Sequence, residues 1–158
     1  MLAAPSIISQ ARKVHDFMTV GAPHPLQEAA VTALRFPDSY YAGLTLEYTR
    51  RREIFLGCLR AAGLQFSEPH GAYYVLVDIS EFGQNDVLFA HWLAREVGVA
   101  AVPGSSFFHE PEPRFIRFHF AKREETLQAA GERLLGLRER AMESFAKSQF
   151  ATDLELVP

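Results

Sequence analysis

The chain has 158 residues, is 48% hydrophobic and carries a formal net charge of −3. That length is enough for one domain with a buried core, and the small negative charge disfavours a general nucleic-acid binder, which normally shows a basic stripe. No apolar run reaches the ~20 residues that a membrane span needs, and the N-terminus does not resemble a signal peptide. The single cysteine, Cys58, rules out an internal disulfide and fits a reducing cytoplasm. We therefore expect a cytoplasmic globular protein that binds neither nucleic acid nor a membrane.

Helices are predicted for most of the first 62 residues. The first runs from Pro5 to about Met18, and the second from about Leu26 to Leu34. Between them, residues 19–25 form a loop, because two prolines and a glycine cannot continue a helix. Asp38 or Ser39 can cap a third helix that reaches Ala62.

Three strands are then predicted. Residues 72–79 are apolar on both faces and are expected to be covered on both. Residues 99–102 form a short strand that Pro103 and Gly104 end, and residues 114–120 alternate like a third strand. Helices are expected from Asn85 or Asp86 to Gly98 and from about Arg123 to Ala146, followed by a tail without a clear period. The fold class is α+β: a small mixed or antiparallel sheet of about three strands covered by helices.

Arg117 is the candidate binding residue in the last of these strands. Ile116, Phe118 and Phe120 share one face, whereas Phe115, Arg117 and His119 share the other. A guanidinium among aromatic residues is costly to desolvate unless an anion meets it, and its planar fork suits a carboxylate. Arg117 is therefore expected to hold a carboxylate, either of a neighbouring Asp or Glu or of a small ligand. The alternative is an edge strand with Arg117 facing water.

Other catalytic signatures are absent from the sequence. Its six histidines show no zinc-ligand spacing, so no metal site is predicted. No phosphate-binding glycine loop, nucleophile elbow or Ser-His-Asp order is present. From the residues alone, the chain has one anion-binding arginine and no catalytic apparatus.

Five stretches, in order, are similar to the motifs of one family. They are Leu2–Pro5; Arg12–Phe17 with Pro23–Ala30; Pro69–Tyr74 with Asp78–Ser80; Val102–Phe108; and Ile116–Phe118. Together they resemble the C-terminal part of class I/II (fold-type-I) aminotransferases, which use pyridoxal phosphate, and in particular the kynurenine, glutamine and methionine aminotransferase branch. Each motif is short, so the shared order over about residues 2 to 145 carries the resemblance.

The resemblance implies roles for several residues. Arg117 matches the arginine that binds the substrate α-carboxylate of an amino acid or 2-oxo acid. The loop that matches Thr19, Val20 and Gly21 lies at the dimer interface and reaches towards the partner's active site, so Val20 and Gly21 are candidates for a cofactor or neighbouring-subunit site. Residues 1–37 would be a remnant of the large cofactor-binding domain, residues 38–147 the small domain and residues 148–158 a tail.

The sequence departs from the family pattern at the catalytic lysine. The family's cofactor lysine lies in a Ser/Thr-x-x-Lys stretch that is followed closely by an arginine for the phosphate, whereas none of Lys13, Lys122 and Lys147 lies in that context. Without that lysine no covalent bond holds the cofactor and no base moves the α-proton. We expect no covalently bound pyridoxal phosphate, and a chain that is inactive alone as less than half of an aminotransferase.

Two other readings remain open. The chain could be a non-enzymatic stand-alone small domain that binds a carboxylate ligand or a partner chain, or an α+β interaction protein without a ligand. By the resemblance, residues 1–34 would pack on the large domain and on the other subunit, and without these Ile7, Ile8, Val14 and Leu26 would leave an exposed apolar patch. Self-association, as a homodimer or otherwise, is therefore expected.

Overall fold

The computed structural model describes residues 3–110 and 112–154, and side chains only as far as residue 146. It divides into two compact units, residues 1–43 and residues 44–158. The division falls within the long helix α3 (Asp38–Ala61), six residues after the boundary expected at residues 37 and 38. Each unit is described by itself below.

The first unit holds α1 (Pro5–Thr19), α2 (His24–Leu34) and the start of α3. α1 lies where the sequence predicts it, whereas α2 begins at His24, two residues earlier than expected, so that His24 and Pro25 belong to the helix and not to the loop. Each helix has a proline in its first turn, where the missing N–H costs nothing. Neither helix has a buried residue. Ile7, Val14 and Leu26 are exposed as expected, whereas Ile8 is half-buried. Both helices therefore offer apolar side chains with nothing from this unit packed over them.

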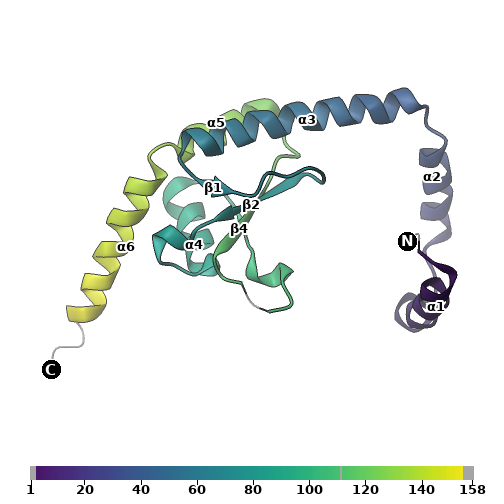
Figure 1. The fold of residues 1–158 in the computed structure, drawn as a ribbon, viewed down its shortest axis with the longest axis horizontal. Helices are drawn as coiled ribbons and strands as arrows, with labels where there is room; N and C mark the ends of the chain where they lie inside the picture. Colours follow the sequence, from purple (N-terminus) through teal and green to yellow (C-terminus); the bar gives the residue numbers. More distant parts are fainter. Residues whose placement is uncertain (1–2, 111, 155–158) are drawn as a thin grey trace. The chain divides into compact units, whose positions relative to one another are not determined.

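A four-stranded antiparallel sheet forms the centre of the second unit (Figure 1). Its order is β1-β2-β4-β3, from strands β1 (Gln65–Phe66), β2 (Tyr74–Asp78), β3 (Val102–Pro103) and β4 (Phe115–His119). The α+β class is thus confirmed, and the two-residue strand β1 is the one that the sequence did not indicate. β3 begins three residues later than expected and includes Pro103, which is tolerated because β3 is an edge strand.

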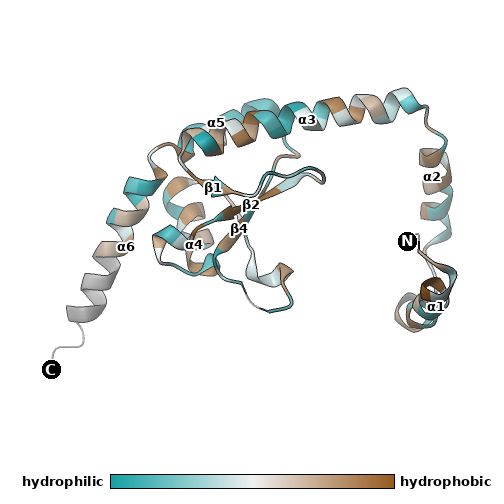
Figure 2. Cartoon of the chain, in the orientation of Figure 1, coloured by the Kyte–Doolittle hydropathy of each residue, from teal (hydrophilic) through white to brown (hydrophobic). Residues whose placement is uncertain are grey.

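Only one face of this sheet is buried. Val75 and Val77 of β2 and Ile116 and Phe118 of β4 are almost fully buried, as the alternation in β4 predicts. On the opposite face Tyr74 and His119 are exposed, and Leu76 is half-buried. The expectation that β2 is covered on both faces is wrong for this unit, because the described helices pack on one side only. Hydrophobic residues accordingly concentrate in β2, β4 and the helices beside them (Figure 2).

Helix α5 (Glu124–Leu134) packs on the second half of α3 above the sheet (Figure 1). At their crossing, a Cβ added to Gly131 would lie 2.3 Å from the Sγ atom of Cys58. A glycine is therefore needed for this close approach, and Cys58 acts as a small packing residue. Phe55 of α3 continues the core towards the sheet, with its ring centroid 5.6 Å from that of Phe118.

The segment after α5 differs from the predicted single helix. α5 ends at Leu134 and a second helix, α6 (Leu137–Leu154), begins after Gly136, whose φ of 68° is left-handed. The guanidinium of Arg140 donates to the carbonyl oxygens of Arg133 and Leu135 and so satisfies the end of α5. α6 also continues to Leu154, beyond the expected end at Ala146; residues 155–158 lie outside the described residues.

Helix α4 (Asp86–Trp92) continues as one π-helical turn, Leu93–Val97, and ends at Gly98, as the sequence predicts. The indole N–H of Trp92 donates to the Ser144 hydroxyl at 3.0 Å, and the Trp92 ring lies 5.1 Å from the ring of Phe145, measured between centroids. These contacts fix the first turns of α6 to the core.

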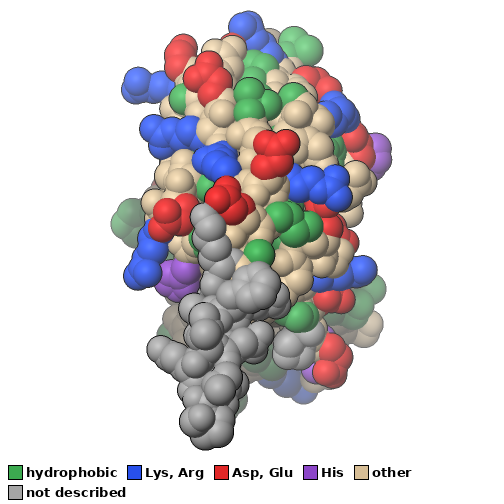
Figure 3. All heavy atoms as spheres, turned by 90° about the vertical axis from the view of Figure 1, so that its left-hand side faces the viewer, with side chains coloured by type: hydrophobic (Ala, Val, Ile, Leu, Met, Phe, Trp, Pro, Cys, Tyr) green, Lys and Arg blue, Asp and Glu red, His purple; other side chains and the backbone are tan. Residues whose placement is uncertain are grey.

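The surface of the second unit is mixed in charge. On the face in Figure 3, acidic and basic side chains are interspersed and form no patch of a single sign. Within the described part of the chain, no helix is both long and apolar enough to cross a membrane.

Candidate carboxylate-binding site

Arg117 lies in the middle of the open face of the sheet. β4 is flanked by β2 and β3, so the edge-strand alternative is wrong. In the antiparallel register Arg117 stands opposite Leu76 on one side and Val102 on the other. Cross-strand neighbours project from the same face, so a half-buried guanidinium is flanked by two aliphatic side chains.

Two aromatic rings hold the Arg117 guanidinium. Its Cζ atom lies 4.0 Å from the ring centroid of Phe107 and 5.0 Å from that of Tyr74. Each such cation–π contact contributes about 0.5–1 kcal/mol where the site is partly exposed. Among the described residues no Asp or Glu forms an ion pair with Arg117. The expectation of a neighbouring carboxylate is therefore not met within this part of the chain, and the guanidinium donors remain available to a ligand.

The loop after β3 places Phe107 over the arginine. Gly104 donates its N–H to the Phe115 carbonyl at 2.8 Å, and a Cβ added there would lie 2.5 Å from the same oxygen. Ser105–Phe107 then forms one 3₁₀ turn, and the Ser105 N–H donates to the Asp86 carboxylate at 2.7 Å. This close approach to β4, rather than a turn needing left-handed backbone, is why position 104 needs glycine.

Arg114 makes the contrast with Arg117 clear. Its guanidinium lies 3.9 Å from a carboxylate oxygen of Asp78 and 3.5 Å from one of Glu112, and its Cζ atom lies 4.6 Å from the Phe115 ring centroid. Its side chain is 54% exposed. Arg114 is therefore a surface residue with acidic partners.

The pKa of His119 depends in part on the charge of Arg117. Burial lowers its pKa from the ordinary 6.5, and the positive charges of Lys122 and Arg117 lower it further. The imidazole is therefore held neutral near pH 7, and any anion bound at Arg117 would oppose the last of these effects.

A groove of about 550 Å³ lies beside the end of β4 and is separate from the Arg117 surroundings. Phe55, Phe118 and Leu127 contribute buried apolar side chains to it, and Lys122 and Glu125 line it. Lys122 and Glu125 are exposed and opposite in sign, and the guanidinium of Arg133, which also lines the groove, donates to the Gly98 carbonyl at 2.8 Å. The groove therefore lacks the excess of buried donors that an anion site requires.

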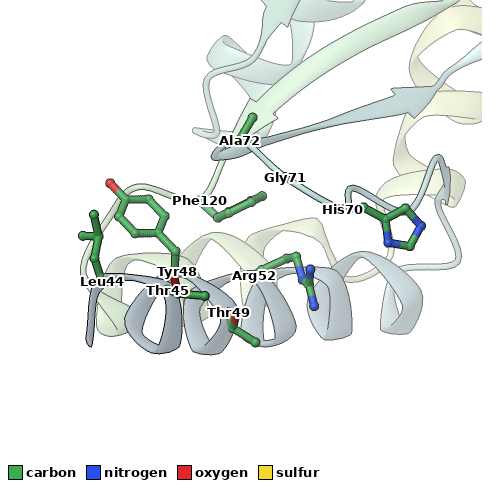
Figure 4. A pocket seen from close by; sticks show the side chains of 9 residues that line it. All are labelled: Leu44, Thr45, Tyr48, Thr49, Arg52, His70, Gly71, Ala72 and Phe120. Carbon is green, nitrogen blue, oxygen red and sulfur yellow. The ribbon is translucent and has the colours of Figure 1, made fainter. Parts of the chain in front are cut away.

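A second pocket, of about 290 Å³, lies between α3 and the start of β2 (Figure 4). Tyr48, Phe120, His70 and Arg52 line it, and Ala72 beside it has a left-handed φ of 58°. The Arg52 guanidinium donates to the Pro69 carbonyl at 3.2 Å and to the Glu53 carboxylate at 2.7 Å. Its charge is thus already paired, which makes this pocket a weaker anion site than the surroundings of Arg117.

Val20 and Gly21 lie in the loop between α1 and α2, in the first unit. Val20 is 86% exposed and has a φ of 61°, which is strained for a β-branched residue. The N–H of Gly21 donates to the Thr19 carbonyl at 2.6 Å. Strained backbone of this kind is typical of functional loops and of segments held by a partner.

Two of the three lysines, Lys13 and Lys122, have described side chains. Lys13 is exposed on α1, and Lys122 is exposed in the groove beside Glu125. The side chain of Lys147 lies outside the described residues. A cofactor held through its aldehyde needs a lysine. No three His, Cys, Asp or Glu side chains gather into a potential metal site among the residues described.

The sheet has one open face, and on it an arginine lies between two aromatic rings, an arrangement that could hold a carboxylate. The family model described as aminotransferase class I and II matches residues 1–134, and the chain belongs to this family. Methionine aminotransferase of Escherichia coli is 41% identical over 134 residues, and kynurenine–oxoglutarate transaminase of Dictyostelium discoideum is 31% identical over 156 residues. The matches cover 83% and 84% of this chain but only 35% and 36% of those proteins.

Solved structures give the same result. An aromatic aminotransferase from Pyrococcus horikoshii superimposes with a TM-score of 0.73 at 33% identity, over 89% of this chain and 38% of that one. The E. coli methionine aminotransferase gives a TM-score of 0.69 at 39% identity, over 84% and 35%. The resemblance seen in the sequence motifs is thereby confirmed, and the chain spans about a third of the length of these relatives.

Proposed function

We propose that this chain is the carboxylate-binding portion of a pyridoxal-phosphate-dependent aminotransferase, an enzyme that moves an amino group between an amino acid and a 2-oxo acid. The observation that carries the proposal is the Arg117 guanidinium, which is half-buried between Phe107 and Tyr74 and has no acidic partner among the described residues. Its role is to bind and orient the α-carboxylate through two parallel N–H donors.

The arrangement around Arg117 suits such a ligand. Leu76 and Val102 stand opposite Arg117 on the neighbouring strands, so apolar side chains lie beside the guanidinium on the same face of the sheet. Orienting the carboxylate fixes the position of the neighbouring α-carbon, where the chemistry of this enzyme class occurs. The names of the relatives, methionine and kynurenine–oxoglutarate aminotransferases, support an amino acid or 2-oxo acid as ligand.

The reaction itself requires groups that we do not assign to this chain. Pyridoxal phosphate supplies an electron sink when it is bound, but no lysine of this chain lies in the sequence context of the family's cofactor lysine. We therefore propose that the polypeptide alone is inactive and retains no covalent cofactor. Residues 1–37 are proposed to belong with the large domain, and residues 38–147 to form the small domain, in a cytoplasmic protein. The alternative is a stand-alone module that binds a carboxylate without catalysis, which the same arginine would also support.

We further propose that the first unit mediates self-association. Phe17 is 95% exposed, and Met18, Val20 and Leu26 are exposed as well. Apolar side chains at this density on two short helices are typical of a protein–protein interface. The strained loop at Val20 and Gly21 would then be held by a partner subunit, close to its cofactor or substrate site.

Titration of the ¹⁵N-labelled chain with 2-oxobutanoate tests the carboxylate site, with 2-oxobutanamide as the uncharged control. We expect the Arg117 side-chain N–H signals and the backbone amides of Val102 and Phe107 to shift with the acid and not with the amide. Shifts confined to Lys122 and Glu125, or to Arg52 and His70, would instead place the anion in the groove or in the second pocket and contradict the proposal.

A further inference from the structure

Asp86 is the one buried charged side chain in the described part of the molecule, and it is only 2% exposed. It forms no ion pair with any described residue. Both carboxylate oxygens instead accept backbone N–H groups, one from Val87 at 3.0 Å and the other from Ser105 at 2.7 Å. Burying a carboxylate is costly, and hydrogen bonds to backbone amides offset that cost only when the geometry is kept.

The cap of α4 does not explain this buried charge. Asn85 already caps the helix, with its side-chain oxygen accepting the Leu88 N–H at 2.9 Å. A charge at Asp86 is favourable near the helix N-terminus, but one of its oxygens is used outside the helix. That oxygen holds the Ser105 amide, in the loop that follows β3.

Ser105 is the first residue of the turn that carries Phe107. The turn is held at its start in two places, by the Gly104 N–H on the Phe115 carbonyl and by the Ser105 N–H on Asp86. The N–H of Phe107 then closes the turn on the Gly104 carbonyl at 2.9 Å. With its backbone fixed in this way, the Phe107 ring packs 4.0 Å from the Arg117 guanidinium carbon, although the ring itself is half exposed.

We propose that Asp86 is a positioning residue for Arg117. The inference rests on the proposed function, since it assigns Asp86 to the carboxylate site. Asp86 does not contact Arg117 itself but acts through the turn Ser105–Phe107. The buried carboxylate fixes the Ser105 amide, the turn fixes Phe107, and Phe107 fixes the guanidinium in the orientation that meets a carboxylate. Without Asp86 the turn would move, and Arg117 would lose one of its two aromatic walls while β4 itself stayed in register.

The test uses the whole chain and two readouts. The first is the chemical shift of the Arg117 side-chain protons, because the Phe107 ring current displaces them whether or not a ligand is present. The second is the dissociation constant of 2-oxobutanoate. The variants are Asp86→Asn, which can accept from only one amide, and Asp86→Ser, whose shorter hydroxyl serves the Val87 amide alone. The latter keeps the proposal testable if the former does not fold.

Two further variants separate positioning from general stability. Asp78→Asn is the matched control, since Asp78 also accepts a backbone N–H, that of Ser80 at 2.9 Å, but is not linked to Phe107. Phe107→Leu removes the ring at the other end of the proposed connection. The double variant Asp86→Asn/Phe107→Leu then measures whether the two side chains act through one another.

The proposal predicts that both Asp86 variants lose the ring-current displacement and bind 2-oxobutanoate at least fivefold more weakly. Asp78→Asn should change affinity less than twofold, and the double variant should be no more than twofold weaker than the weaker single variant. Unchanged Arg117 shifts and affinity in a folded Asp86 variant, or effects of Asp86 and Phe107 that multiply, would overturn the positioning role. If the wild-type chain binds no 2-oxobutanoate while the Asp86 variants still lose the displacement, the proposed function fails and the positioning role stands.

Discussion

Gly104 approaches β4 so closely that its N–H lies 2.8 Å from the Phe115 carbonyl oxygen, and an added Cβ would lie 2.5 Å from the same atom. Gly104→Ala should therefore push the loop away from β4 and lower the free energy of unfolding by about 1–3 kcal/mol, as overpacking does. Gly71→Ala is the matched control, because nothing lies within 4 Å of a Cβ there. Chemical denaturation of both variants measures the difference. Equal stability of the two would show that the loop is free to move.

His119 should make folding depend on pH. Its pKa is lowered in the folded state by burial and by the charges of Lys122 and Arg117, whereas the unfolded chain titrates near 6.5. As the pH falls through the window below 6.5, the unfolded chain binds the proton first, so the free energy of unfolding decreases. Lys122→Gln removes one of the repelling charges and should raise the His119 pKa.

NMR titration of the His119 imidazole, together with denaturation at a series of pH values, checks this dependence. His109→Asn is the control, because the His109 side chain is fully exposed. It should leave the pH dependence unchanged, whereas His119→Asn should flatten it. A carboxylate bound at Arg117 should also raise the His119 pKa. A His119 that titrates at or above 6.5 in the free chain would contradict this account.

Much of this fold follows from local pattern. Alternation alone assigned the two faces of β4, and the C-terminal ends of α1, α2 and α3 fall within one residue of those predicted, but Pro25, which was expected in a loop, lies in the first turn of α2. The break between α5 and α6 was missed because the apolar period runs through Gly136, whose left-handed backbone interrupts the helix. β1 was missed because two residues carry no recognisable period.

The site was predicted only in part. A charged residue in an apolar strand indicated Arg117, but its aromatic neighbours come from Tyr74 on another strand and Phe107 in a loop, and no spacing in the sequence links them. The sequence indicated Asp86 only as a possible first residue of a helix, and nothing in the pattern predicted that its side chain would be buried. The open face of β2 was missed as well. A strand that is apolar on both faces predicts packing on both, but the described helices cover only one of them.

The lysines should not capture pyridoxal phosphate at one position. Lys13 and Lys122 are both exposed, and neither lies in the sequence context of the family's cofactor lysine. After incubation with pyridoxal phosphate and reduction by borohydride, intact mass spectrometry should show no adduct, or sparse labelling spread over several lysines. A stoichiometric adduct at a single lysine would reveal a cofactor site in this chain and refute the inactive-portion proposal.

Self-association through the first unit should be visible in sedimentation. Phe17 and Leu26 are highly exposed, so Phe17→Ser combined with Leu26→Ser should shift the chain towards monomer by removing apolar contact area. Leu135→Ser is the matched control, because Leu135 is an exposed leucine of the second unit. A wild-type chain that remains monomeric at high concentration would contradict the proposed interface.

The most direct measurement is the affinity for 2-oxobutanoate of Arg117→Gln compared with Arg114→Gln, by NMR titration. Each variant removes one arginine: Arg117 lies within β4, and Arg114 directly precedes that strand. Of the two, Arg114 has acidic partners, whereas Arg117 has none among the described residues. Losing a hydrogen-bonded charge costs about 1.5–3 kcal/mol, so Arg117→Gln should bind about tenfold or more weakly. Arg114→Gln should stay within twofold of wild type. Equal affinities for the two variants would contradict the assignment of Arg117 as the carboxylate-binding residue.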